Sequence, residues 1–296
     1  MSEVGPESLR MGVTAVMLPE LSFEEQVELC VELGVGFYVY RPRVVPEGQR
    51  GKGYSNWGDH RFDLTPERLV KEGAGFAARL RDAGMQPYCT VPGGTNERDA
   101  ARFAVDCEGA AAGGCSRIRL QPMGYPQGVF DYAAYLAEAR GWLEEQVEIA
   151  SGFGLKSAIE MHTGNSACSP GLAVRLVEGM DPERIGLIVD LPNFVREGSV
   201  KPGLGVSALG PYVDHAHVGG CRVTVGEVDE LGFRKAATEF CGLEASDLDV
   251  RGWLDAALVA APDAVWVIED YTAGVSGAER LRATAGWVKR WWQGRG

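Results

Sequence analysis

The sequence is poor in histidine and in basic residues for its length. Among 296 residues there are four histidines, and 29 lysines and arginines stand against 41 aspartates and glutamates, giving a formal net charge of −12. A field of this sign repels a polyanion such as DNA and an anionic membrane surface over a long range. We therefore expect that neither nucleic acid nor a membrane is a partner, whereas the charge does not argue against a small ligand.

Paired cysteines and long apolar runs are also missing. The cysteines are odd in number, are scattered and never form a Cys-x-x-Cys pair, which disfavours a disulfide framework or a thiolate zinc site and fits a reducing compartment. No apolar run approaches the roughly 20 residues that cross a bilayer, and the N-terminal MSEVGPESLR lacks the basic-then-apolar pattern of a signal peptide. We expect a cytoplasmic protein. The cysteines are Cys30, Cys89, Cys107, Cys115, Cys168, Cys221 and Cys241.

What the sequence does contain is a regular alternation of short β-rich runs and longer helical runs. Apolar strands that alternate with helices predict a parallel sheet buried on both faces, and eight such units in this length favour a closed (β/α)8 barrel. A doubly wound sheet is the alternative, but no G-x-G-x-x-G follows the first strand. The predicted strands are 11–19, 36–43, 86–93, 117–124, 155–164, 184–193, 213–220 and 263–271.

We predict that the whole chain, residues 1–296, forms this one barrel domain with roughly eight helices. Long loops are expected after the second strand and, over residues 219–249, after the seventh strand. Loops of that length at a barrel mouth are often lids. Tryptophans at helical spacing in the last helix (Trp287, Trp291 and Trp292) indicate packing on the barrel, with a contact in a homo-oligomer as the alternative.

The last four predicted strands each end in a side chain that can bind a metal. These are Glu160, Asp190, His217 and Glu269. In a barrel of this type, chemistry takes place at the carboxyl ends of the strands. Residues i and i+2 of a strand face the same side, so His215 and His217 both point into the barrel. His217, nearer the mouth, is the better ligand, and His215 is expected to support it from one layer below.

Three carboxylates that converge with one imidazole would raise one another's pKa and oppose folding unless a cation were present. Three hard oxygen donors and one nitrogen suit Mn²⁺ as first choice, with Mg²⁺, Co²⁺ or Zn²⁺ as alternatives, and they leave room for substrate oxygens. We therefore predict a divalent metal site.

The motifs IEMH, VDLPN, HAHVGG and VIEDY, in this order, resemble the metal-binding strand ends of the xylose isomerase-like superfamily of sugar isomerases and epimerases. The resemblance implies that Glu160, Asp190, His217 and Glu269 bind the metal and that Glu160 and Glu269 form an acid/base pair. Two positions depart from the pattern. Asn193 stands where many members have histidine, and Gly220 stands where ketose 3-epimerases have glutamate, with Arg222 near the position of their arginine.

The chemistry implied is the movement of a proton next to the carbonyl of a ketose, a keto-sugar or a polyol-derived ketone, through a metal-stabilised enediolate. The alternative on the same scaffold is a dehydratase or lyase that acts by β-elimination, including C-glycoside cleavage. A metal-dependent phosphodiesterase or endonuclease is a remote alternative, because it needs more histidines and a basic surface. A non-catalytic sugar-binding barrel ranks last.

Five further residues are candidates for contact with substrate. His162 lies on the mouth side of Glu160, and Asn193 can bond a hydroxyl. Arg41 ends the second strand, where its guanidinium could bind a carboxylate, a phosphate or hydroxyls or else neutralise the acidic cluster. His60 and Arg222 lie in the two long loops. A solvated loop histidine is the alternative for His60.

Overall fold

The computed structural model describes residues 9–93, 99–197 and 200–295 and contains the predicted barrel. The order around the barrel is β1-β10-β7-β6-β5-β4-β3-β2, which closes on itself, and all neighbouring strands are parallel. The strands are β1 (Met11–Thr14), β2 (Phe37–Tyr40), β3 (Gln86–Thr90), β4 (Arg117–Leu120), β5 (Lys156–Glu160), β6 (Ile185–Asp190), β7 (Val213–Val218) and β10 (Trp266–Ile268).

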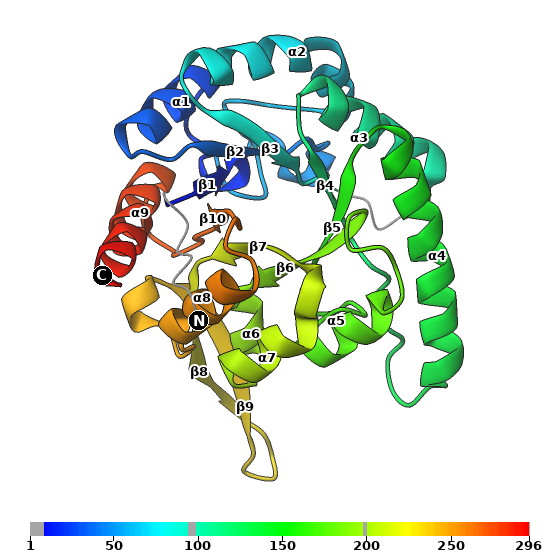
Figure 1. Cartoon of the computed structure of the whole chain (residues 1–296). Helices are drawn as coiled ribbons and strands as arrows, with labels where there is room; N and C mark the ends of the chain where they lie inside the picture. The colour runs from blue at the N-terminus through cyan, green and yellow to red at the C-terminus, as the bar shows by residue number, and fades with distance from the viewer. Residues whose placement is uncertain (1–8, 94–98, 198–199, 296) are drawn as a thin grey trace.

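Helices surround these strands, as Figure 1 shows. They are α1 (Phe23–Glu32), α2 (Pro66–Asp82), α3 (Ala100–Ala112), α4 (Tyr132–Gly152), α5 (Pro170–Val177), α6 (Leu191–Glu197), α7 (Pro202–Leu209), α8 (Val250–Ala260) and α9 (Gly277–Gln293). None of the described helices is long and apolar enough to span a membrane. Residues 1–8, which carry most of the N-terminal segment considered for a signal peptide, lie outside the described residues.

Local sequence signals explain where several helices begin. Ser22 and Glu25 form the reciprocal capping box that starts α1. Thr65 caps α2, with Pro66 in the first turn. After α2 the chain turns at Gly84, whose φ of +76° favours glycine.

The alternation of strands and helices along the chain is less strict than predicted. The predicted strand 184–193 ends at Asp190, and α6 starts at the next residue. One reason is that the Asp190 carboxylate accepts a hydrogen bond from the backbone N–H of Asn193 at 2.9 Å, as a helix cap does. Two helices, α6 and α7, therefore separate β6 from β7, and Pro192 belongs to a helix instead of sharing a strand face with Asp190.

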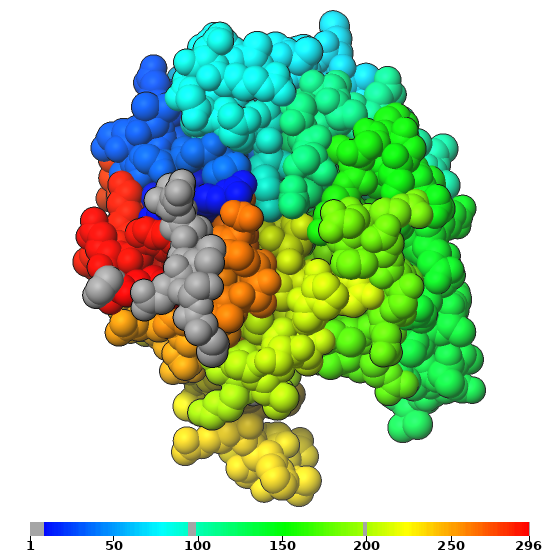
Figure 2. Space-filling model, viewed as in Figure 1, coloured from blue at the N-terminus to red at the C-terminus, as the bar shows by residue number. Residues whose placement is uncertain are grey.

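The long segment after β7 is largely a β-hairpin. Strands β8 (Gly220–Val228) and β9 (Arg234–Cys241) pair antiparallel and form a separate two-stranded sheet. Figure 1 shows the hairpin extending away from the barrel, and in the space-filling view its tip protrudes from the body (Figure 2). Its base, where Gly220 pairs with Cys241, stays close to the barrel, so only the base of the hairpin can reach the mouth.

The cysteines and the tryptophans of the last helix belong to the core of the barrel domain. All seven cysteines are free thiols and buried. Trp291 is 5% exposed and packs against Trp266 with ring centroids 5.5 Å apart, and Trp287 and Trp292 pack partly buried against the same core. The packing explanation for the tryptophans of the last helix is therefore confirmed.

Candidate metal centre and its cavity

Glu160, Asp190, His217 and Glu269 come together at the carboxyl ends of β5, β6, β7 and β10. One ligand atom from each residue lies within 4.8 Å of those of the others, and all four residues are buried. The His217 Nδ1 atom is 2.6 Å from Glu269 Oε2, 3.2 Å from Asp190 Oδ2 and 3.7 Å from Glu160 Oε1. This donor set matches the chemistry of a divalent cation that prefers hard ligands.

The electrostatics of the cluster also indicate a cation. Burial, together with the charges of Glu160 and Glu269, raises the pKa of Asp190 to about 7, although His217 acts in the opposite direction. Burial lowers the pKa of His217, but the three carboxylates more than reverse this and raise it well above its usual range. The imidazole thus takes the position of the positive charge among the carboxylates. A metal ion in that position would release this proton and satisfy the same oxygens.

Each of the two glutamates is held by a neighbour on its outer side. Arg119, on β4, forms an ion pair with Glu160 through Oε2, which leaves Oε1 facing His217. Tyr271 donates its hydroxyl hydrogen to Glu269 Oε1 at 2.6 Å, which leaves Oε2 facing His217. Burial raises the pKa of Glu160, but Arg119 and His217 hold it well below its usual range. The two carboxylates are therefore oriented before any substrate arrives.

His215 lies below this cluster in a second, separate network. Its Nδ1 bonds Asp214 Oδ2 at 2.7 Å, and its ring centroid is 5.4 Å from that of His217. Asp214 also pairs with Arg117 on β4 at 2.8 Å and with Lys156 on β5 at 3.1 Å. These strands are not neighbours of β7, so the contacts are made across the barrel interior. The placement of His215 agrees with a supporting position.

A register shift between β6 and β7 brings Asp214 inside. Leu187 pairs with Val213, whereas the next residue, Ile188, pairs with His215, so Asp214 is skipped. Simple alternation along the strand would turn Asp214 away from the histidines. Gly186 makes room for it, because a Cβ at that position would lie 2.6 Å from Asp214 Cβ.

Next to the metal cluster is a cavity of about 410 Å³ at the barrel mouth. Of the predicted site residues, Glu160, Asp190, Glu269, His162, Asn193 and Arg41 line it. His162 Nδ1 lies 2.8 Å from the Thr163 carbonyl oxygen, and the Asn193 side chain bonds Arg196 at 3.5 Å.

Two predicted contact residues lie elsewhere. Arg222 is on the exposed part of the hairpin, where it forms an ion pair with Glu239. His60 lies within the loop after β2, 3.3 Å from the Asn56 carbonyl oxygen, and burial together with Arg43 lowers its pKa to about 4. Neither is among the residues that line the cavity.

Residues that the sequence did not single out complete the cavity. The loop after β2 contributes Trp57, and the base of the hairpin contributes Phe240; both rings pack on Tyr271, at centroid distances of 5.4 and 5.2 Å. Arg43 fixes the loop by donating to the carbonyl oxygens of Trp57 and Gly58. Aromatic walls of this kind stack on the apolar faces of sugar rings.

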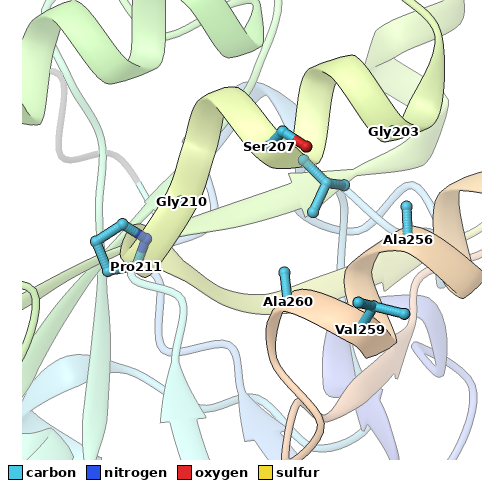
Figure 3. A pocket seen from close by; sticks show the side chains of 8 residues that line it. Gly203, Ser207, Gly210, Pro211, Ala256, Val259 and Ala260 are labelled. Atoms are coloured by element: carbon cyan, nitrogen blue, oxygen red, sulfur yellow. The ribbon is translucent and has the colours of Figure 1, made fainter. Parts of the chain in front are cut away.

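A second hollow of about 450 Å³ lies on the outside of the barrel between α7 and α8. As Figure 3 shows, Ser207, Pro211, Ala256, Val259 and Ala260 surround it. No titratable side chain is among its described lining residues, so the mouth cavity is the candidate catalytic site.

Comparison with known proteins shows what this architecture resembles. No family model matches the sequence, and no curated protein is similar to it at the sequence level. Solved structures are similar over nearly the whole chain, and these similarities show a fold shared with the xylose isomerase-like TIM-barrel proteins.

Three of these solved structures illustrate the range of proteins that share the fold. A xylose isomerase-like TIM-barrel protein from Mycobacterium smegmatis in complex with magnesium is 15% identical, with 98% of each chain covered and a TM-score of 0.66. D-Psicose 3-epimerase, solved in the presence of D-fructose, is 13% identical, with 95% of this chain and 98% of the other covered and a TM-score of 0.66. A probable 3-DHS dehydratase from Bacillus anthracis is 12% identical, with 95% and 99% covered and a TM-score of 0.67.

Proposed function

We propose that this protein is a divalent-metal-dependent isomerase or epimerase that moves a proton on a carbon next to the carbonyl of a sugar or a polyol-derived ketone. The observation that carries the proposal is the convergence of Glu160, Asp190, His217 and Glu269 beside a cavity at the barrel mouth. The shared fold supports it, because proteins with this fold include a ketose 3-epimerase and a magnesium complex.

The four clustered residues would hold the metal, with Mn²⁺ as first choice. A divalent cation there would supply a positive charge that stabilises the negative charge developing on the carbonyl oxygen of the substrate. Glu160 and Glu269 are separated in the strand order by β6 and β7, so they approach the cavity from different sides. One carboxylate can take a proton from one face of the substrate, and the other can return it to the opposite face.

The surrounding residues position the reaction. Arg119 and Tyr271 fix the outer oxygens of the two glutamates, as described above. Trp57 and Phe240 enclose the cavity and exclude water from the reacting carbon. His162 and Asn193, which also line the cavity, are placed to bond substrate hydroxyls. No proton-carrying histidine stands at position 193, so we assign both proton transfers to the glutamates.

The test is incorporation of deuterium from solvent. A panel of ketoses and inososes is incubated in D₂O with Mn²⁺, the reaction is stopped with EDTA, and proton NMR identifies the exchanged carbon. We expect deuterium next to the carbonyl, none when EDTA is present from the start, and rates lowered by at least 100-fold in Glu160→Gln and Glu269→Gln. A protein that binds metal and exchanges no proton in any of these substrates would contradict the proposal.

The second candidate is a dehydratase or lyase that acts by β-elimination on the same site. The specific observation in its favour is the aromatic wall of Trp57, Phe240 and Tyr271, which can hold an aromatic leaving group such as that of a C-glycoside. A dehydratase is also among the proteins that share the fold. The same NMR experiment separates the two, because elimination gives an unsaturated product or a released aglycone instead of a labelled sugar.

A further inference from the structure

One of the arginines that line the cavity is not paired with the carboxylates that line it. Three arginines line it: Arg41 after β2, Arg119 on β4 and Arg196 on α6. Arg119 is engaged by Glu160. Among the described residues, no carboxylate lies within the 4.0 Å ion-pairing distance of the Arg41 guanidinium. Arg41 therefore does not neutralise the acidic cluster by direct contact.

Arg41 is held in a defined position even though none of the carboxylates in the described part of the chain pairs with it. Its Nη1 atom donates to the Val91 carbonyl oxygen at 2.7 Å, and its guanidinium lies 6.0 Å from the centroid of the Trp57 ring. Gly93 leaves the space that it occupies, since a Cβ there would lie 3.0 Å from Nη1. Guanidinium carries five N–H donors in a planar fork, so most of them are left for a molecule in the cavity.

The cost of this arrangement is a lowered pKa of Arg41. Burial, with the neighbouring charge of Arg119 as the largest electrostatic contribution, lowers its pKa to about 10. A partly buried guanidinium that no described carboxylate pairs with is unfavourable unless a ligand supplies the negative charge. A planar fork that faces a cavity matches the geometry of a carboxylate or a phosphate group.

We infer that Arg41 is an anion subsite and that the substrate carries a carboxylate or phosphate group in addition to its carbonyl. This inference rests on the proposed function for the carbonyl chemistry, and it narrows the substrate from neutral ketoses to acidic ones. Trp57 covers one face of the guanidinium and would cover the bound anionic group from the loop side. The overall charge of −12 does not exclude a small anion at this position, because Arg119 and Arg43 place positive charge beside Arg41.

The first experiment measures anion binding without turnover. Inorganic phosphate and malonate are titrated calorimetrically, with EDTA present, into the wild type, Arg41→Gln, Arg41→Lys and the control Arg61→Gln. Arg61 belongs to the same loop but forms an exposed ion pair with Glu25. We expect saturable binding that is weakened at least tenfold by Arg41→Gln, less by Arg41→Lys, and not by Arg61→Gln. Absent saturation in the wild type, or equal affinity in Arg41→Gln, would overturn the inference.

The second experiment distinguishes a carboxylate from a phosphate group as the bound anion. It also tests the anion subsite separately from the proposed function. With Mg²⁺ bound, D-fructuronate and D-fructose 6-phosphate are compared with D-fructose. Tighter binding of the first indicates a carboxylate and tighter binding of the second a phosphate, and Arg41→Gln should abolish either preference. If D-fructose exchanges deuterium but neither D-fructuronate nor D-fructose 6-phosphate binds more tightly than D-fructose, the proposed function stands and the anion subsite is refuted. Metal binding without any exchange refutes the proposed function instead.

Discussion

At the scale of single residues, the two histidines of β7 have different surroundings and should respond differently to substitution. His217 contacts all three carboxylates of the cluster, whereas His215 bonds Asp214 in the layer below. We expect His217→Ala to lose bound metal and activity together. His215→Ala should keep its metal, with activity reduced less than tenfold. Metal content is measured by elemental analysis after dialysis, and full metal retention in His217→Ala would refute the assignment of this ligand.

Tyr271 offers a second test at this scale, because its hydroxyl holds one oxygen of Glu269. Burial raises the pKa of Glu269, and the hydrogen bond from Tyr271 is among the interactions that lower it. Tyr271→Phe removes a donor to the charged form, so the pKa of Glu269 should rise and the acid limb of the pH–rate profile should move to higher pH. We expect a decrease of about tenfold in kcat, equivalent to about 1.4 kcal/mol.

A matched control for this substitution is Tyr212→Phe, which removes a hydroxyl that bonds the Met180 carbonyl oxygen outside the cavity. Its pH–rate profile should be that of the wild type. Identical profiles for both tyrosine variants would mean that Tyr271 does not set the ionisation of Glu269.

The site residues that the sequence predicts lie at strand ends, whereas most of those that it does not predict lie in a loop or a hairpin. Glu160, Asp190, His217 and Glu269 were found because strand ends and alternation fix which side chains meet at a barrel mouth. Arg119 does have a sequence signal, because it lies two positions after Arg117 in the strand RIRL and therefore faces the same side; both arginines pair with carboxylates inside the barrel. Trp57 and Phe240 had no such signal, because loop and hairpin geometry depends on tertiary packing.

At the scale of elements, the register shift between β6 and β7 shows where alternation is insufficient. A bulge of one residue cannot be read from the pattern of VDHAHV, yet it decides that Asp214 lies inside, against Arg117 and Lys156. The ends of β6 and the start of α6 were misplaced for a related reason. The run LIVDLPN is apolar except for Asp190 and Asn193, so a buried strand and a buried helix give the same sequence signal.

The Asp214 network should make a large contribution to the stability of β7. Burial opposes the charge of Asp214, but His215, Arg117 and Lys156 lower its pKa below the usual range. We expect Asp214→Asn to reduce the free energy of unfolding by about 3 kcal/mol at pH 7, because it leaves the partly buried Arg117 and Lys156 without their counter-charge. Urea unfolding at several pH values measures the effect.

The contribution of Asp214 to stability should decrease as the pH falls. The folded-state pKa of Asp214 lies below its unfolded value of about 4, so its contribution is complete above that value and is lost as the pH falls through the folded pKa. The difference in the free energy of unfolding between the wild type and Asp214→Asn should thus be the same at pH 6 and at pH 7, and it should decrease below about pH 4. Asp263→Asn, at an exposed ion pair with Arg10, should cost less than about 1 kcal/mol at all pH values.

The tip of the hairpin should be dispensable for the site. Val225 pairs with Ala236, and beyond this pair Leu231 and Phe233 are 83% and 69% exposed. Replacing residues 226–235 by an Asn-Gly turn should shift the melting temperature by less than about 2 °C and leave metal and sugar binding unchanged, while Phe240 remains in place. Calorimetry measures both. Weakened sugar binding in the shortened protein would show that the tip reaches the cavity after all.

At the scale of the whole molecule, stability should depend on the metal, because the ligands come from four different strands of one closed barrel. A ligand that binds only the folded state stabilises it by about 2.7 kcal/mol at 100 times its Kd. For a domain of this size we expect Mn²⁺ to raise the melting temperature by about 4 °C, and EDTA to reverse the shift. The shift should be absent in His217→Ala.

This stabilisation should increase with pH over the neutral range. Asp190, whose pKa is raised to about 7, and His217, whose pKa is raised well above its usual range, must both lose a proton to bind a cation. The melting-temperature shift caused by Mn²⁺ should consequently be larger at pH 8 than at pH 6. Exposed carboxylates titrate near pH 4, so weak cation binding to the acidic surface cannot produce this difference. An equal shift at both pH values, or one retained in His217→Ala, would place the stabilising metal outside the barrel mouth.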